Sequence, residues 1–81
     1  MLTLGERRVE VIGHTDAQGS RASNVALSLA RAQAVKSYLV GRGLDNERIA
    51  TSGMGPDQPV ADNLTEQGRA RNRRIEFRVG S

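Results

Sequence analysis

Two charged residues fifteen positions apart, Asp16 and Arg31, are the side chains of this chain best suited to chemistry. Asp16 lies in a polar turn after an apolar segment, and Arg31 lies within the long helix that we expect to follow the turn. A guanidinium among apolar neighbours is costly unless a negative charge pairs with it, and Asp16 is the nearest candidate in sequence. A zwitterion fits such a pair, with its ammonium group on the carboxylate and its carboxylate on the guanidinium.

The segment that carries Arg31 has the apolar period of a helix that runs to about Val40. Ser20 is suited to the N-cap, Gly19 to a positive φ at the entry, and Gly41 and Gly43 to the C-terminal end. At 3.6 residues per turn most apolar side chains of this helix form one broad arc, which consists of Val25, Leu29, Ala32, Val35 and Leu39. Two further apolar residues, Leu27 and Tyr38, extend the arc on its other side. The polar residues Asn24, Ser28 and Arg31 lie between these two apolar groups.

Three segments alternate apolar and polar residues as strands do: 7–13, 48–53 and 74–79. A strand, a long helix and a second strand predict a parallel pair joined by a right-handed crossover. A short second helix is expected from an N-cap at Thr65 to about Asn72. The predicted fold is therefore an α/β (α+β) two-layer domain in βαβ-α-β order. Its small mixed sheet packs against one long helix and a short second helix.

The connection at residues 54–64 contains Pro56 and Pro59, which fix φ, so we expect an ordered loop. Asp62 and Asn63 are expected to hydrogen-bond local backbone in it. With 81 residues the whole chain, 1–81, is one small domain, in which residues 1–6 are a weakly patterned lead-in.

Catalysis and metal binding are not expected. The chain has no cysteine and one histidine, His14, so no cluster of soft ligands or His–Cys pair is available. His14 lies beside an aspartate, but no nucleophile or oxyanion site accompanies the two, and we expect a structural residue of the turn. We therefore expect a binding domain without cofactor, metal or catalytic residues.

The basic residues near the end of the chain suggest a nucleic-acid surface, which the composition argues against. The net charge is only +3, and Glu66 and Glu76 interrupt the arginines between 69 and 78. Phe77 is the one aromatic residue there, and its strand alternation turns it inward, away from any stacking role. No segment approaches the ~20 apolar residues of a membrane span. Neither nucleic-acid binding nor membrane insertion by this segment is expected.

Four stretches of the sequence together resemble a known family. They read VIGHTDAQGS, NVALSLARAQAVKSYL, SGMGPDQPVADN and TEQGRARNRRIEF, and they cover most of residues 9–79. In this order and spacing they resemble the OmpA-like peptidoglycan-binding domain of outer-membrane porin anchors, peptidoglycan-associated lipoproteins and flagellar stator proteins. The resemblance implies a periplasmic domain that binds cell-wall peptidoglycan and tethers an outer-membrane or envelope protein to it.

The resemblance also implies a ligand and its residues. Asp16 and Arg31 match the two family positions that hold the free end of diaminopimelate in the peptidoglycan stem peptide. The other matching positions support that pocket: Gly13 and Thr15 in the loop, Asn24, Leu27 and Ser28 on the helix, and Arg74 within the closing NRR motif.

The family domain usually begins with a strand and a helix for which too few residues precede Val9 here. We therefore expect an N-terminally shortened version with an exposed edge at strand 75–79. Exposed edges pair readily, so a homodimer through this strand, or one with exchanged elements, is expected. The alternative function is that of a structural or assembly fragment that retains the fold and has lost ligand binding.

Overall fold

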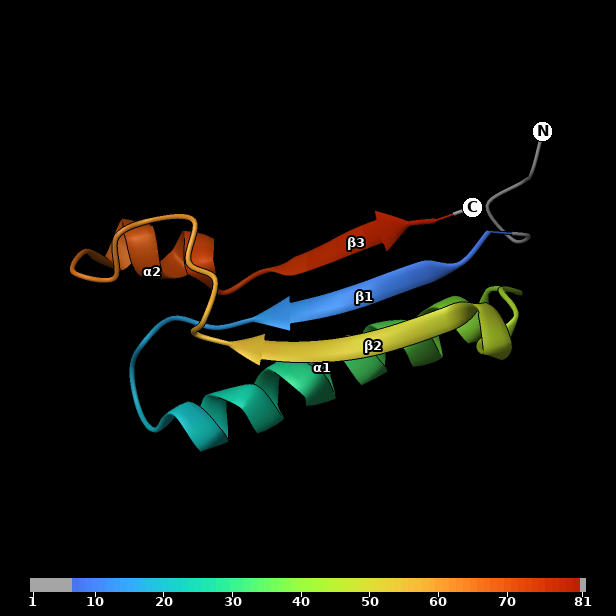
Figure 1. Cartoon of the computed structure of the whole chain (residues 1–81), viewed down its shortest axis with the longest axis horizontal. Coiled ribbons are helices and arrows are strands. Elements are labelled where there is room, and N and C mark those ends of the chain that lie inside the picture. The colour runs from blue at the N-terminus through green and yellow to red at the C-terminus, as the bar shows by residue number, and fades with distance from the viewer. Residues whose placement is uncertain (1–6, 81) are drawn as a thin grey trace.

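The computed structural model describes residues 7–80, so the predicted lead-in at 1–6 lies outside the described residues. The elements follow one another as predicted, with one additional 3₁₀ turn (Figure 1). They are β1 (Val9–His14), α1 (Arg21–Gly41), η2 (Asn46–Arg48), β2 (Ile49–Gly55), α2 (Glu66–Asn72) and β3 (Ile75–Val79). The mixed sheet, the two α-helices and their order confirm the predicted fold class.

The sheet has the order β2-β1-β3 within the described part of the chain. β1 and β2 are parallel, as the strand–helix–strand pattern predicted, and β1 and β3 are antiparallel. Val9 is the Cα partner of Ile49 on one side and of Val79 on the other. The register with β2 shifts between Gly13 and His14, where the ladder is irregular. The central strand β1 thus ends at the turn that carries Asp16.

The ends of α1 follow from local chemistry. The Ser20 hydroxyl accepts a hydrogen bond from the Ser23 N–H at 3.1 Å, which confirms the predicted N-cap. Gly19 has a φ of 85°, which lets the chain turn sharply into the helix. Gly41 is still helical, and Gly43, with a φ of 105°, follows the Arg42 C-cap. The helix therefore ends within one residue of the predicted boundary.

The core lies between α1 and the β1–β2 half of the sheet (Figure 1). It consists of aliphatic side chains, with partly buried neighbours around them: Val9, Val11, Ala32 and Ile49, then Val35, Leu39, Leu44 and Ile75. Two expectations about its extent are wrong. Leu27 and Tyr38 are 44% and 63% exposed, and Phe77 is 54% exposed, because no described element covers the side of α1 and β3 on which they lie.

The loop before α2 is fastened by one buried side chain, Asn72. Its Oδ1 accepts from the backbone N–H groups of Val60 and Ala61 at 2.8 and 3.0 Å, and its amide donates to the Ala61 carbonyl. Asp62 accepts from the Leu64 N–H, as predicted. Asn63 differs from the prediction, because its side-chain oxygen accepts from the Asn72 amide rather than bonding local backbone. The NRR asparagine thus fixes the loop beside the end of the sheet.

Candidate functional site

Asp16 lies just beyond the C-terminal end of β1, and its backbone is held against β2. The Thr15 N–H donates to the Gly55 carbonyl at 2.9 Å, and the Thr15 hydroxyl donates to the Asp16 carbonyl at 2.8 Å. The Asp16 Oδ1 accepts from the Gln18 N–H at 3.0 Å, which forms a local Asx turn. Asp16 is 7% exposed, and this hydrogen bond holds its carboxylate in position.

The second oxygen of Asp16 binds a guanidinium, but it is that of Arg73. The Arg73 Nη1 lies 2.8 Å from Asp16 Oδ2, and its Nη2 lies 2.7 Å from Glu66 Oε1. The hydrogen bond from Arg73, with that from the Gln18 N–H, lowers the pKa of Asp16. Asp16 is therefore a carboxylate at neutral pH, oriented by a residue at the end of α2. The sequence interpretation missed this pair, and the NRR motif was the signal that could have suggested it.

Arg31 lies on the exposed surface of α1 and has no ion pair with Asp16. The expectation that it needs a partner because it sits among buried apolar neighbours was wrong, since Leu27 and Tyr38 on that side of the helix are themselves exposed. Within residues 7–80 the structure shows no carboxylate bound to Arg31. Its guanidinium is thus open to solvent, whereas Asp16 is engaged and nearly buried.

The residues expected to support the pocket join α1 to the strand ends. Gly13 packs directly on the α1 backbone, because a Cβ built there would lie 2.7 Å from the Ser28 carbonyl carbon. Ser28 is buried, and its hydroxyl donates to the Val25 carbonyl and accepts from the Gly55 N–H at 3.0 Å. Asn24 donates to the Gln18 carbonyl at 2.6 Å and so ties the loop to the helix. These contacts fix the loop of Asp16 relative to the helix of Arg31.

Arg74 occupies a different position from its neighbour Arg73. Its Nη2 donates to the Gln58 carbonyl at 3.0 Å and lies 3.4 Å from Glu76 Oε1. Arg74 therefore holds the loop before α2 and does not contact Asp16. His14 is the last residue of β1 rather than part of the turn, and it is 1% exposed. Its Nε2 lies 2.7 Å from Glu76 Oε1, although their alignment does not meet hydrogen-bond geometry. His14, Arg74 and Glu76 form a structural cluster at the end of the sheet.

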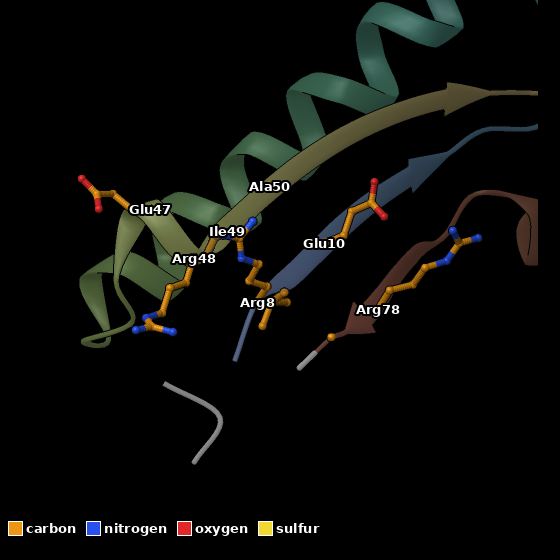
Figure 2. A pocket seen from close by; sticks show the side chains of 9 residues that line it. Arg8, Glu10, Glu47, Arg48, Ile49, Ala50 and Arg78 are labelled. Atoms are coloured by element: carbon orange, nitrogen blue, oxygen red, sulfur yellow. The ribbon is translucent and has the colours of Figure 1, made fainter. Parts of the chain in front are cut away.

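A surface hollow of about 350 Å³ lies elsewhere on the described structure (Figure 2). It is at the opposite end of the strands and contains neither Asp16 nor Arg31. Charges of both signs line it, among them Arg8, Glu10 and Glu47. Figure 2 shows the Arg48 and Arg78 side chains pointing in opposite directions, so this hollow does not gather its guanidinium groups around one anion.

Metal ligands and membrane-spanning helices can each be considered for the described residues. No group of three or more histidine, cysteine, aspartate or glutamate residues within 7–80 could hold a metal ion. No helix of this part of the chain has the length and apolarity to cross a membrane. The candidate site consists of the turn that holds Asp16 and of the exposed Arg31 on α1.

Comparisons with known proteins agree with this architecture. The OmpA family matches residues 2–73. Outer membrane protein A of Bordetella avium is 50% identical over 68 residues, which are 84% of this chain and 35% of that protein. The peptidoglycan-binding protein ArfA of Mycobacterium bovis is 47% identical over 74 residues, which are 91% of this chain and 23% of that protein. The chain thus spans about a third or less of these relatives.

A solved structure shares the fold over most of this chain. The peptidoglycan-associated lipoprotein of Burkholderia pseudomallei superposes with a TM-score of 0.87 and 32% sequence identity, over 90% of this chain and 62% of that one. Together with the outer-membrane relative, this lipoprotein confirms the expected location in the cell envelope. The family match extends over most of the sequence, including β1, α1, β2 and α2. The chain therefore belongs to the OmpA family.

Proposed function

We propose that this domain binds peptidoglycan non-covalently through the free end of diaminopimelate and so anchors an envelope protein to the cell wall. Asp16 takes the ammonium group of the ligand, and Arg31 takes its carboxylate. Relatives are named for peptidoglycan binding and peptidoglycan association, and the role proposed here is of the same kind. The reaction is recognition rather than catalysis.

One observation carries the proposal: the charge and fixed position of Asp16. Its two oxygens accept from the Gln18 N–H and from Arg73, which keeps the pKa low and the carboxylate oriented. A carboxylate has about four lone-pair sites, so an ammonium group can still bind beside these two donors. Arg31 contributes the complementary charge, because its exposed guanidinium has no carboxylate partner within residues 7–80. Charge-assisted hydrogen bonds of both kinds give orientation as well as affinity.

Co-sedimentation with purified diaminopimelate-type peptidoglycan tests this function. The unmodified chain should pellet with the polymer, and Arg31→Ala, a change at an exposed position, should remain in the supernatant. Arg71→Ala is the matched control, since Arg71 is an exposed arginine of the other helix and should not matter. If the unmodified chain is folded but does not pellet, the alternative of a fragment that retains only the fold is correct.

We also propose, as the sequence suggested, that the chain self-associates through residues 75–79.

A further inference from the structure

The guanidinium of Arg73 is divided between two carboxylates. Its Nη1 donates to Asp16 Oδ2 at 2.8 Å, and its Nη2 donates to Glu66 Oε1 at 2.7 Å. A guanidinium that faces a single carboxylate can bind both of its oxygens through two parallel N–H···O bonds. Here each carboxylate receives one bond from Arg73. The part of the Asp16 carboxylate that remains for a ligand therefore depends on where Arg73 is held.

Glu66 is itself fixed through both of its oxygens. Its Oε1 accepts from Arg73, and its Oε2 accepts from Arg69 Nε at 3.2 Å. Arg69 is anchored in turn, because its Nη1 donates to the Asn63 carbonyl at 2.9 Å in the loop before α2. The hydrogen bond from Arg73, followed by that from Arg69, lowers the pKa of Glu66. At neutral pH Arg73 is thus held by a charged and anchored carboxylate.

We propose that Glu66 is a positioning residue for the amine end of the ligand, because it binds Nη2 of Arg73 and so leaves acceptor sites of Asp16 for the ammonium group. This inference rests on the proposed function of Asp16. A carboxylate has about four lone-pair sites, of which the Gln18 N–H and Arg73 each occupy one on Asp16. Without Glu66, Arg73 can turn its second nitrogen to Asp16 and compete with the ammonium group.

The charges around Asp16 support the same role. Asp16, Arg73, Glu66 and Arg69 are two carboxylates and two guanidinium groups, so their charges sum to zero. The hydrogen bond from Arg73 lowers the pKa of Asp16 most, and the positive charge of Arg69 lowers it further. Removing the charge of Glu66 leaves this group with a net positive charge. Because like charges repel, an ammonium group would then bind Asp16 more weakly.

The exposure of Glu66 makes this role separable from folding. Its side chain is 64% exposed, and that of Arg73 is 35% exposed, so the guanidinium has room to turn. Exposed ion pairs contribute little to stability, about 0–1 kcal/mol each. Glu66→Gln removes the charge and preserves the approximate size of the side chain. This variant should therefore fold like the unmodified chain.

Carbon-13 NMR titration of the Asp16 carboxyl group in the unliganded chain tests the role of Glu66 directly. In Glu66→Gln the pKa of Asp16 should fall further, because Arg73 binds its carboxylate more fully and the negative charge of Glu66 is gone. If Glu66 only stabilised α2, the substitution would loosen Arg73 from Asp16 and raise this pKa. An unchanged or raised pKa of Asp16 would overturn the proposal.

Calorimetric titration with diaminopimelate and lysine stem peptides supplies the second measurement. Glu66→Gln should bind both stems about 10-fold more weakly, as the loss of one charge-assisted hydrogen bond to their shared amine predicts. Glu47→Gln is the matched control, because it removes the same charge from an exposed glutamate at the opposite end of β2 (Figure 2). It should bind like the unmodified chain.

The outcomes of this titration separate the two proposals. If Glu66→Gln and Glu47→Gln bind with equal affinity, the role of Glu66 is wrong although the proposed function stands. If the unmodified chain is folded and binds neither stem, the proposed function is wrong, and the role of Glu66 is wrong with it.

Discussion

Replacing Gly13 by alanine should destabilise the domain because the β1 and α1 backbones touch there. A Cβ at this position would lie 2.7 Å from the Ser28 carbonyl carbon and closer still to its oxygen, whereas ordinary contacts begin near 3.4 Å. The obstacle is backbone, so no side-chain rotation can relieve it. The φ of Gly13 is not among the positive ones, so the expected effect comes from packing rather than from the backbone conformation.

The magnitude follows from the cost of overpacking, which is about 1–3 kcal/mol for a well-packed site. A domain of this length has about 4–12 kcal/mol of total stability, so the loss is a substantial part of it. The Tm should fall by at least about 4 °C. Thermal and urea unfolding followed by circular dichroism measure both quantities. Gly41→Ala is the matched control, since a Cβ at this helical position meets nothing within 4 Å and should be neutral or stabilising.

Equal stabilities of Gly13→Ala and Gly41→Ala would refute the close approach of α1 to β1. That result would also mean that Gly13 does not support the site, because its proposed support is the contact with Ser28 that sets the position of the helix carrying Arg31.

Three further outcomes are expected. Ser28→Ala should cost about 1–3 kcal/mol in urea unfolding, because the Gly55 N–H loses its acceptor in a buried position, and an unchanged midpoint would contradict this. Asn72→Ala should speed amide exchange at Val60 and Ala61, and unaltered protection there would argue against its role in holding the loop. The lowered pKa of Asp16 stabilises the fold above its unfolded pKa of about 3.9, and this stability is lost as pH falls through the folded value. Asp16→Asn should therefore flatten the decline of stability on acidification below about pH 4, as urea titrations would show.

The sequence was sufficient to predict structural features that depend on residues close together in the chain. Ser20 and Thr65 are caps whose partners lie three positions away, and Gly19 and Gly43 have the positive φ that their turns need. The parallel pair followed from the length of the helix between β1 and β2.

Features that depend on distant residues were missed. The Asp16–Arg73 pair joins positions 57 apart, and no periodicity relates them. Helical and strand periods show which residues share a face but not whether another element covers it. Leu27, Tyr38 and Phe77 were therefore expected in the core and lie at the surface. His14 was expected in the turn, but pairing with the distant residues Gly55 and Arg74 extends β1 to include it, and it is buried there.

The assignment of the two ligand charges is tested most directly by comparing two stem peptides. Diaminopimelate differs from lysine at the free end of the stem by one carboxylate, on the carbon that bears the amine. If Arg31 binds this carboxylate, the lysine stem lacks one charge-assisted hydrogen bond, which is worth about 1.5–3 kcal/mol. It should then bind about 10- to 100-fold more weakly to the unmodified chain.

Calorimetric titration of three proteins with both stems gives the decisive comparison. The unmodified chain should prefer the diaminopimelate stem, Arg31→Ala should lose most of that preference, and Asp16→Asn should weaken both stems alike because both carry the amine. Equal affinity of the unmodified chain for the two stems would contradict the assignment of Arg31 to the ligand carboxylate.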